Sequence, residues 1–139
     1  MARLLKKKTS TVFAPPNEER QKVILVADDS EMVCNFHSYI LKNAGYKTIS
    51  AIDGADALEK LLQNEIDLVA TDINMPNMDG YELVKRIRAI PEYEDLPIIM
   101  ISTESEAQDK QRGFDAGANV YIVKPTPPQR LVESVNLLI

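Results

Sequence analysis

Five polar side chains stand at or near the points where four apolar runs of this chain end. In chain order they are Asp28, Asp29, Asp72, Ser102 and Lys124. If the runs are parallel strands, their carboxyl ends meet at one edge of a sheet, where open α/β proteins build their sites. Three carboxylates brought together there repel each other unless a cation lies among them. Mg²⁺, or Mn²⁺ in its place, suits a site of few carboxylates with room for water and a phosphate.

The same five groups could carry out phosphoryl transfer. One carboxylate can act as a nucleophile toward an incoming phosphoryl group and form an aspartyl phosphate. Negative charge develops on the phosphoryl oxygens, and the Lys124 ammonium and the Ser102 hydroxyl can stabilise it. The residue types therefore predict a metal-dependent phosphoryl acceptor.

The elements that would position these groups alternate along the chain. A continuous apolar run, typical of a strand buried on both faces, occupies residues 22–27, and we expect further strands over 46–52, 66–71, 97–101 and 119–123. Helical patterns follow each run, over residues 31–44, about 55–62, 80–90, 106–116 and a last segment ending at 139. We expect residues 91–95 to form a loop.

Two of these helices carry specific expectations. The first can be capped by Ser30 and ended by Gly45. Its predicted buried face comprises Val33, Phe36, Ile40, Leu41 and Ala44. On the same helix, we expect His37 to have a structural role and Cys34 to be a small buried hydrophobic residue. The helix over 106–116 has only a thin apolar stripe, so it would be held weakly. It is either a solvated surface helix or an element beside the site that can move at little cost.

The order of elements predicts the fold. Five βα units are too few for an eight-fold barrel, and they predict an α/β protein with helices on both faces of a five-stranded parallel sheet. The compact arrangement is the doubly wound, flavodoxin-like sheet with strand order 2-1-3-4-5. Its topological switch point lies beside strands one and three, which end at Asp28-Asp29 and at Asp72.

Composition and charge limit the classes of function that this chain can have. The chain of 139 residues is 45% hydrophobic, and it has no run of roughly 18 apolar residues that could span a membrane. Its single cysteine excludes an internal disulfide, so we expect a reducing, cytoplasmic location. Residues 1–20 carry five cations and two acids, a net charge of +3, and form the expected flexible extension. The net charge of the whole chain is −5, so residues 21–139, the expected single domain, have a net charge of −8. This negative charge argues against direct nucleic-acid binding.

The stretch Asp72–Gly80, Asp-Ile-Asn-Met-Pro-Asn-Met-Asp-Gly, completes a pattern. The interval from Asp28 to the start of this stretch is 44 residues, with 30 more to Ser102 and 22 more to Lys124. With these residues the chain resembles response-regulator receiver domains of two-component signalling over the whole predicted domain. The stretch itself is especially similar to that of chemotaxis response regulators.

The resemblance implies roles for the acidic residues. Asp72 would be the phosphoacceptor. Asp29 and Asp72 would bind Mg²⁺ directly, and Asp28 would bind it through water. The main-chain carbonyl of Asn74 would be a further ligand.

The resemblance also implies a phosphate-binding and switching group. Ser102 and Lys124 match the hydroxyl and the lysine that bind the phosphate, and Lys124-Pro125 matches a cis peptide bond with Pro125. Tyr121 matches an aromatic residue that turns inward on activation.

Four positions bear on rate and partner. Thr103 replaces a usual small residue and could restrict access to the phosphate, and Thr126 replaces a common aromatic on the signalling face. Asn74 and Glu104 flank the site. We expect Asn74, Glu104 and Thr103 to influence how fast water attacks the acyl phosphate.

We therefore expect a stand-alone response regulator. It would accept a phosphoryl group on Asp72 from the phosphohistidine of a sensor kinase or phosphotransfer protein and would act on an unidentified protein target. Phosphorylation would draw Ser102 inward, turn Tyr121 and change the face formed by helix 106–116, the fifth strand and the last helix. Such a protein promotes only its own phosphorylation and dephosphorylation and is not otherwise an enzyme. Chemotaxis is the favoured setting, and a phosphorelay intermediate is the alternative.

Two rivals from other classes are disfavoured. An aspartate-nucleophile phosphatase would need a second acid two residues after the nucleophile, where this chain has Asn74. A flavin-binding module would need a phosphate-cradling loop after the first strand, and Asp28-Asp29 would repel the flavin phosphate.

Overall fold

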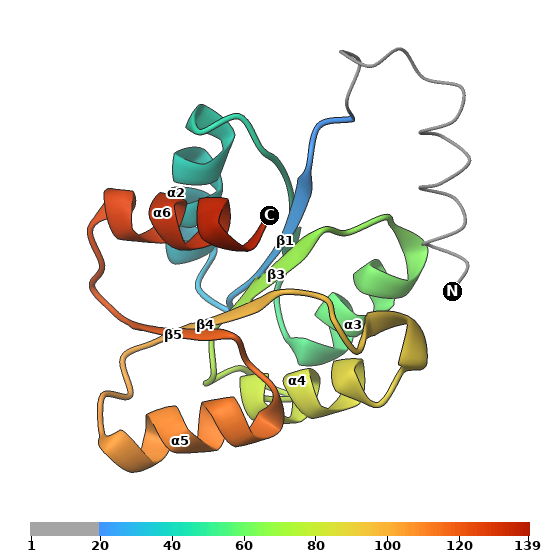
Figure 1. Cartoon of the computed structure of the whole chain (residues 1–139). Helices are drawn as coiled ribbons and strands as arrows, with labels where there is room; N and C mark the ends of the chain where they lie inside the picture. Colours follow the sequence, from blue (N-terminus) through green and yellow to red (C-terminus); the bar gives the residue numbers. More distant parts are fainter. Residues whose placement is uncertain (1–19) are drawn as a thin grey trace.

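A central parallel sheet organises the protein, and the computed structural model describes residues 20–139 (Figure 1). The strands are β1 (Val23–Ala27), β2 (Lys47–Ala51), β3 (Leu68–Thr71), β4 (Ile98–Ser102) and β5 (Val120–Val123). Neighbouring strands all pair in parallel, and their order is β2-β1-β3-β4-β5. The predicted doubly wound fold is confirmed. The predicted N-terminal extension lies outside the described residues except for its last residue, Arg20.

Helices cover both faces of the sheet (Figure 1). One face carries α2 (Glu31–Asn43) and α6 (Pro128–Leu138), which contact each other. The other face carries α3 (Gly54–Gln63), α4 (Gly80–Arg88) and α5 (Ala107–Ala116) in that order. The loop expected over 91–95 contains a short 3-10 turn, η1 (Pro91–Tyr93). In residues 20–139 no helix has both the length and the apolar character that a membrane span requires.

The inner strands β1, β3 and β4 are almost continuously apolar because both of their faces are buried. Every residue of β1, β3 and β4 is buried. Successive residues point to opposite faces, so Leu25 joins the core under α3–α5 while Ile24 joins the core under α2 and α6. The sheet is thus rigidly held from both sides, and its carboxyl edge is a fixed platform.

Helix α2 begins and ends as predicted, and its predicted buried face is confirmed at Ile40 and Leu41 but not at Phe36 and Ala44. The Ser30 hydroxyl accepts a hydrogen bond from the Val33 amide at 3.3 Å, and Gly45 has a φ of +98°. Phe36 was predicted to be buried, yet it is 51% exposed. Ala44 is also exposed. The buried face consists of Cys34, His37, Ser38, Ile40 and Leu41.

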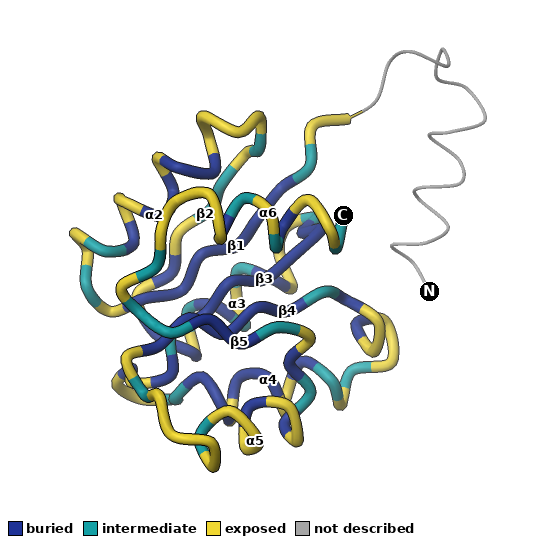
Figure 2. The backbone as a smooth tube through the Cα atoms, turned by 60° about the vertical axis from the view of Figure 1, so that its left-hand side comes forward, coloured by how far each residue is buried: buried dark blue, intermediate teal, exposed yellow. Residues whose placement is uncertain are grey.

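Helix α5 buries little of its surface. Only Gly113 and Ala116 of its ten residues are buried, and Phe114 is exposed. The helix is drawn almost entirely in the exposed colour in Figure 2, unlike the neighbouring α4. The expectation of a thinly buried helix at this position is confirmed.

Candidate functional site

Three carboxylates meet where β1 and β3 end side by side. The amide of Asp72 donates a hydrogen bond to the carbonyl of Ala27 at 2.9 Å, which extends the pairing of the two strands to their tips. One carboxylate oxygen from each of Asp28, Asp29 and Asp72 lies within 4.8 Å of the other two. Asp28 is buried, Asp72 is partly buried and Asp29 is exposed, so the cluster opens to solvent on one side.

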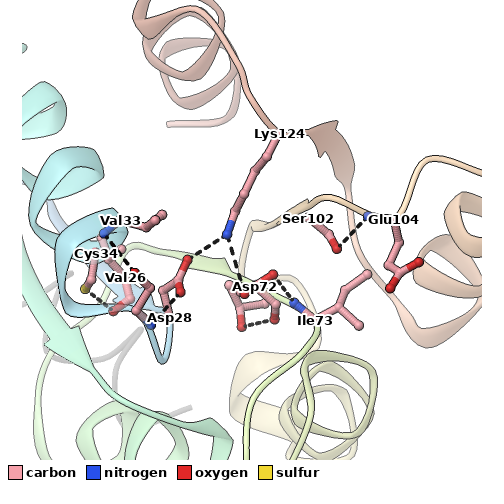
Figure 3. A network of polar contacts seen from close by, with 11 residues as sticks. Val26, Asp28, Val33, Cys34, Asp72, Ile73, Ser102, Glu104 and Lys124 are labelled. Carbon is pink, nitrogen blue, oxygen red and sulfur yellow. Dashed lines mark hydrogen bonds and ion pairs between the residues drawn. The ribbon is translucent and has the colours of Figure 1, made fainter.

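Lys124 reaches this cluster from the end of β5 (Figure 3). Its Nζ atom donates a hydrogen bond to Oδ2 of Asp28 at 2.8 Å and lies 3.4 Å from Oδ2 of Asp72. The amide of Lys124 donates to the carbonyl of Ser102 at 2.8 Å, which aligns the ends of β4 and β5. The peptide bond between Lys124 and Pro125 is cis, as the resemblance implies.

The local charges favour a cation at this edge. Burial raises the pKa of the Asp72 carboxyl, and the charge of Asp28 raises it further, while Lys124 opposes both effects. A single ammonium leaves the three carboxylates with an excess of negative charge. Oxygen donors in this arrangement are the ligands that Mg²⁺ prefers, so the donor set fits a divalent metal of that class.

The hydroxyl of Ser102 is fully buried beside the cluster. It accepts a hydrogen bond from the amide of Glu104 at 3.1 Å. The side-chain amide of Asn74 donates to Oε1 of Glu104 at 3.1 Å, which joins the loop after β3 to the loop after β4. Thr103, which lies between Ser102 and Glu104 in the chain, is exposed. The residues predicted to influence the rate therefore surround one rim of the site.

Tyr121 of β5 already points inward. Its side chain is buried, and its hydroxyl donates to the main-chain carbonyl of Glu104 at 2.7 Å. Burial raises the pKa of the Tyr121 hydroxyl to about 12. The main chain of Glu104 is thus bonded both to Ser102 through its amide and to Tyr121 through its carbonyl.

Sequence reasoning missed several residues that support the site. Asp53 caps α3 and also accepts a hydrogen bond from Asn77, and Tyr81 donates to the carbonyl of Asp109 at the start of α5. The Asp-Gly pair at 53–54 was an available signal for a capped helix start. No local pattern could show its contact with Asn77, 24 residues away.

Comparisons with known proteins agree with this geometry. The family described as the response regulator receiver domain matches residues 24–136. A chemotaxis protein CheY homolog of Campylobacter jejuni is 41% identical over 114 residues, which are 81% of this chain and 88% of that protein. A gliding motility regulatory protein of Myxococcus xanthus is 37% identical over 113 residues, but the chain spans only 14% of its length.

Solved structures give the same result. The chemotaxis response regulator CheY4 of Vibrio cholerae superposes with a TM-score of 0.82 at 35% identity, and the match covers 86% of this chain and 100% of that one. Among the sequence relatives, a transcriptional regulatory protein, PrrA of Mycobacterium tuberculosis, is 36% identical over 118 residues, 49% of its own length. Relatives thus include both chemotaxis and transcriptional proteins. The chain belongs to the response regulator receiver domain family.

Proposed function

We propose that Asp72 accepts a phosphoryl group from a phosphohistidine on a sensor kinase or phosphotransfer protein. A carboxylate oxygen of Asp72 forms the new O–P bond while the N–P bond of the donor breaks, and the bonding pair stays on the imidazole nitrogen. The observation that carries the proposal is the position of the Asp72 carboxylate, among two other acids and 3.4 Å from the ammonium of Lys124. The receiver domain would comprise residues 21–139.

Each neighbouring residue has a definable part in this step. Asp29, Asp72 and the main-chain carbonyl of Asn74 would hold Mg²⁺ or Mn²⁺, with Asp28 contributing through water. Bound Mg²⁺ supplies positive charge that offsets the crowded carboxylates and the phosphoryl oxygens. Lys124 and Ser102 would bind the phosphoryl oxygens once the group is on Asp72.

The signal would leave through the face made by α5, β5 and α6. A phosphoryl group adds negative charge and acceptor oxygens beside Ser102, whose hydroxyl holds the Glu104 amide. A shift of Ser102 toward the phosphoryl group would move Glu104, and the carbonyl that anchors Tyr121 moves with it. The weakly buried α5 follows this loop, so it is the element that responds at least cost.

For the signalling pathway, we propose the type of role and not a specific partner. A chemotaxis-type role is favoured because CheY homologues are matched over most of their length. A phosphorelay intermediate is the alternative, and it would return its phosphoryl group to a histidine on a second phosphotransfer protein. In either role, the activity of the protein would be confined to its own phosphorylation and dephosphorylation, and its target would be another protein.

The direct test is incubation with Mg²⁺ and acetyl phosphate followed by intact-protein mass spectrometry. We expect one added phosphoryl group that depends on Mg²⁺ and is lost in Asp72→Asn. Asp79→Asn is the matched control, because Asp79 lies in the same loop and an asparagine can replace its cap of the Glu82 amide. Labelling that persists in Asp72→Asn, or that disappears equally in Asp79→Asn, would refute the proposal.

A further inference from the structure

The loop that follows the phosphoacceptor, residues 73–79, is tied at its tip to the start of α3. Oδ2 of Asp53 accepts a hydrogen bond from Nδ2 of Asn77 at 2.7 Å. Oδ1 of the same carboxylate accepts from the amide of Asp56 at 2.7 Å and caps the helix. Asp53 is only 7% exposed. One buried carboxylate therefore joins two segments that are distant in sequence.

Main-chain contacts reinforce this link. The amide of Gly54 donates to the carbonyl of Met78 at 3.1 Å, and a Cβ atom at position 54 would lie 2.4 Å from that oxygen. Asn77 has a φ of +69°, a conformation that asparagine tolerates better than most residues. The tip of the loop thus fits against α3 in one position only.

The base of the loop also packs closely against the end of β3, the strand that precedes Asp72. The amide of Gly80 donates to the carbonyl of Ile73 at 2.8 Å. A Cβ atom at position 80 would lie 2.1 Å from the carbonyl oxygen of Asp72. Asn74 lies between these two attachments, so the direction of its main-chain carbonyl depends on both.

We infer that Asp53 and Asn77 are positioning residues of the metal site, because their hydrogen bond holds the loop that carries Asn74, whose main-chain carbonyl would be a ligand of the metal. The inference rests on the metal site of the proposed function and concerns its affinity for Mg²⁺. Hydrogen bonds from the Asp56 amide and from Asn77 lower the pKa of Asp53, so its carboxylate is ionised when it binds the loop. A residue that only caps α3 would affect the stability of the fold and leave metal affinity unchanged.

The test measures Mg²⁺ binding to the unphosphorylated protein by isothermal titration calorimetry, without a phosphodonor. Asn77→Asp places a second carboxylate against Asp53 while keeping a residue type that tolerates positive φ. We expect the dissociation constant for Mg²⁺ to rise by about tenfold, the lower end of what loss of a ligand-orienting partner produces.

A reciprocal variant provides the rescue. The double variant Asp53→Asn/Asn77→Asp keeps an oxygen to cap α3 and exchanges donor and acceptor across the same contact. It should return the dissociation constant to within about threefold of the wild type. Arg88→Lys is the control, because Arg88 holds main-chain groups around Gly117 and Leu96, beyond the opposite end of the sheet, and should lower the melting temperature alone.

Three outcomes overturn the inference: an unchanged Mg²⁺ affinity in Asn77→Asp, an equal loss of affinity in Arg88→Lys, or no recovery in the double variant. Failure of the proposed function looks different. A wild-type protein that binds Mg²⁺ but takes no phosphoryl group from acetyl phosphate would refute phosphoryl acceptance, and the positioning role would stand.

Discussion

Lys124 is the ammonium that faces the three carboxylates, and its removal should destabilise the protein through charge. Lys124→Met keeps most of the aliphatic stem and removes the ammonium that lies 2.8 Å from Asp28 and 3.4 Å from Asp72. Breaking a fully buried ion pair by removal of one partner costs about 3–5 kcal/mol, because an uncompensated charge stays behind.

The side chains here keep some contact with water, which lowers that figure. Lys124 is 15% exposed and Asp72 is 11% exposed. We therefore expect the free energy of unfolding to fall by about 2–3 kcal/mol at pH 7.5 without divalent cations. For a domain of this size the loss corresponds to a melting temperature lower by about 8–12 °C.

The pH dependence has a definite sign. Burial raises the pKa of Asp72, and Lys124 opposes that rise, so the variant should raise the pKa of Asp72 further. A carboxyl with a raised pKa in the folded state binds its proton more tightly when folded than when unfolded. Its ionisation therefore destabilises the fold above the folded-state pKa, and the destabilisation disappears as the pH falls toward the unfolded value. The deficit of Lys124→Met should be largest near pH 7.5 and should shrink toward pH 5.

Urea unfolding followed by circular dichroism, at both pH values and with or without Mg²⁺, checks this prediction. Mg²⁺ should also reduce the deficit, because the carboxylates of the variant lack the competing ammonium and should bind the ion more tightly than those of the wild type. The variant then gains more of the stabilisation that a ligand of the folded state supplies, which is about 2.7 kcal/mol at 100 times the dissociation constant. Lys60→Met is the control, because its pair with Asp56 is partly exposed and should contribute no more than about 1 kcal/mol. A deficit that is independent of both pH and Mg²⁺ would assign the loss to packing of the lysine stem.

Two further predictions concern stability away from the site. Arg88 donates to the carbonyls of Tyr93, Leu96 and Gly117 and to the Asn119 side chain, so Arg88→Lys should lower the free energy of unfolding by about 2–3 kcal/mol in urea titrations. A loss below about 1 kcal/mol would show that the hydrogen bonds of the Arg88 guanidinium contribute little to stability. On α2, Leu41→Ala should cost about 2–5 kcal/mol, whereas Phe36→Ser should change the stability by no more than about 0.5 kcal/mol. Equal losses for these two variants would contradict the exposure of Phe36.

The sheet and its order could be predicted because burial on both faces leaves a strong trace in the sequence. The two faces of each inner strand contact different helices, so nearly every residue of β1 and β4 must be apolar. The five strand-end residues were visible because each interrupts or follows such a run. Parallel pairing then requires their side chains to lie at one edge, where Asp28, Asp29, Asp72 and Lys124 are in fact found together.

Only part of the buried face of α2, Ile40 and Leu41, could be predicted from its pattern. The helix has an apolar stripe of Met32, Phe36 and Tyr39, but that stripe is exposed. Its buried face includes His37 and Ser38 at helical spacing with Leu41. Burying polar groups is unfavourable, so His37 and Ser38 give no sequence signal for an inward face, and burial lowers the pKa of His37. The sheet and α6 determine which side faces inward, and neither leaves a mark within the helix itself.

Contacts between loops also lay beyond the reach of the sequence. The Asn77–Asp53 and Tyr121–Glu104 hydrogen bonds join residues 24 and 17 positions apart. Each partner taken alone has an ordinary local explanation, as a turn residue, a cap or a core aromatic. Only the fold shows that the pairs meet.

These contacts divide the surroundings of Asp72 into a fixed side and a yielding side. The loop after β3 is held by close main-chain approaches at Gly54 and Gly80, where a side chain would not fit. The loop after β4 depends instead on three hydrogen bonds that all involve Glu104, from its own amide to Ser102 and from the side chains of Asn74 and Tyr121. A phosphoryl group that accepts a hydrogen bond from the Ser102 hydroxyl would draw this oxygen toward itself, together with the Glu104 amide that donates to it. Because Glu104 leads into the thinly buried α5, we expect the change to pass through the loop after β4 into α5 while the loop after β3 stays in place.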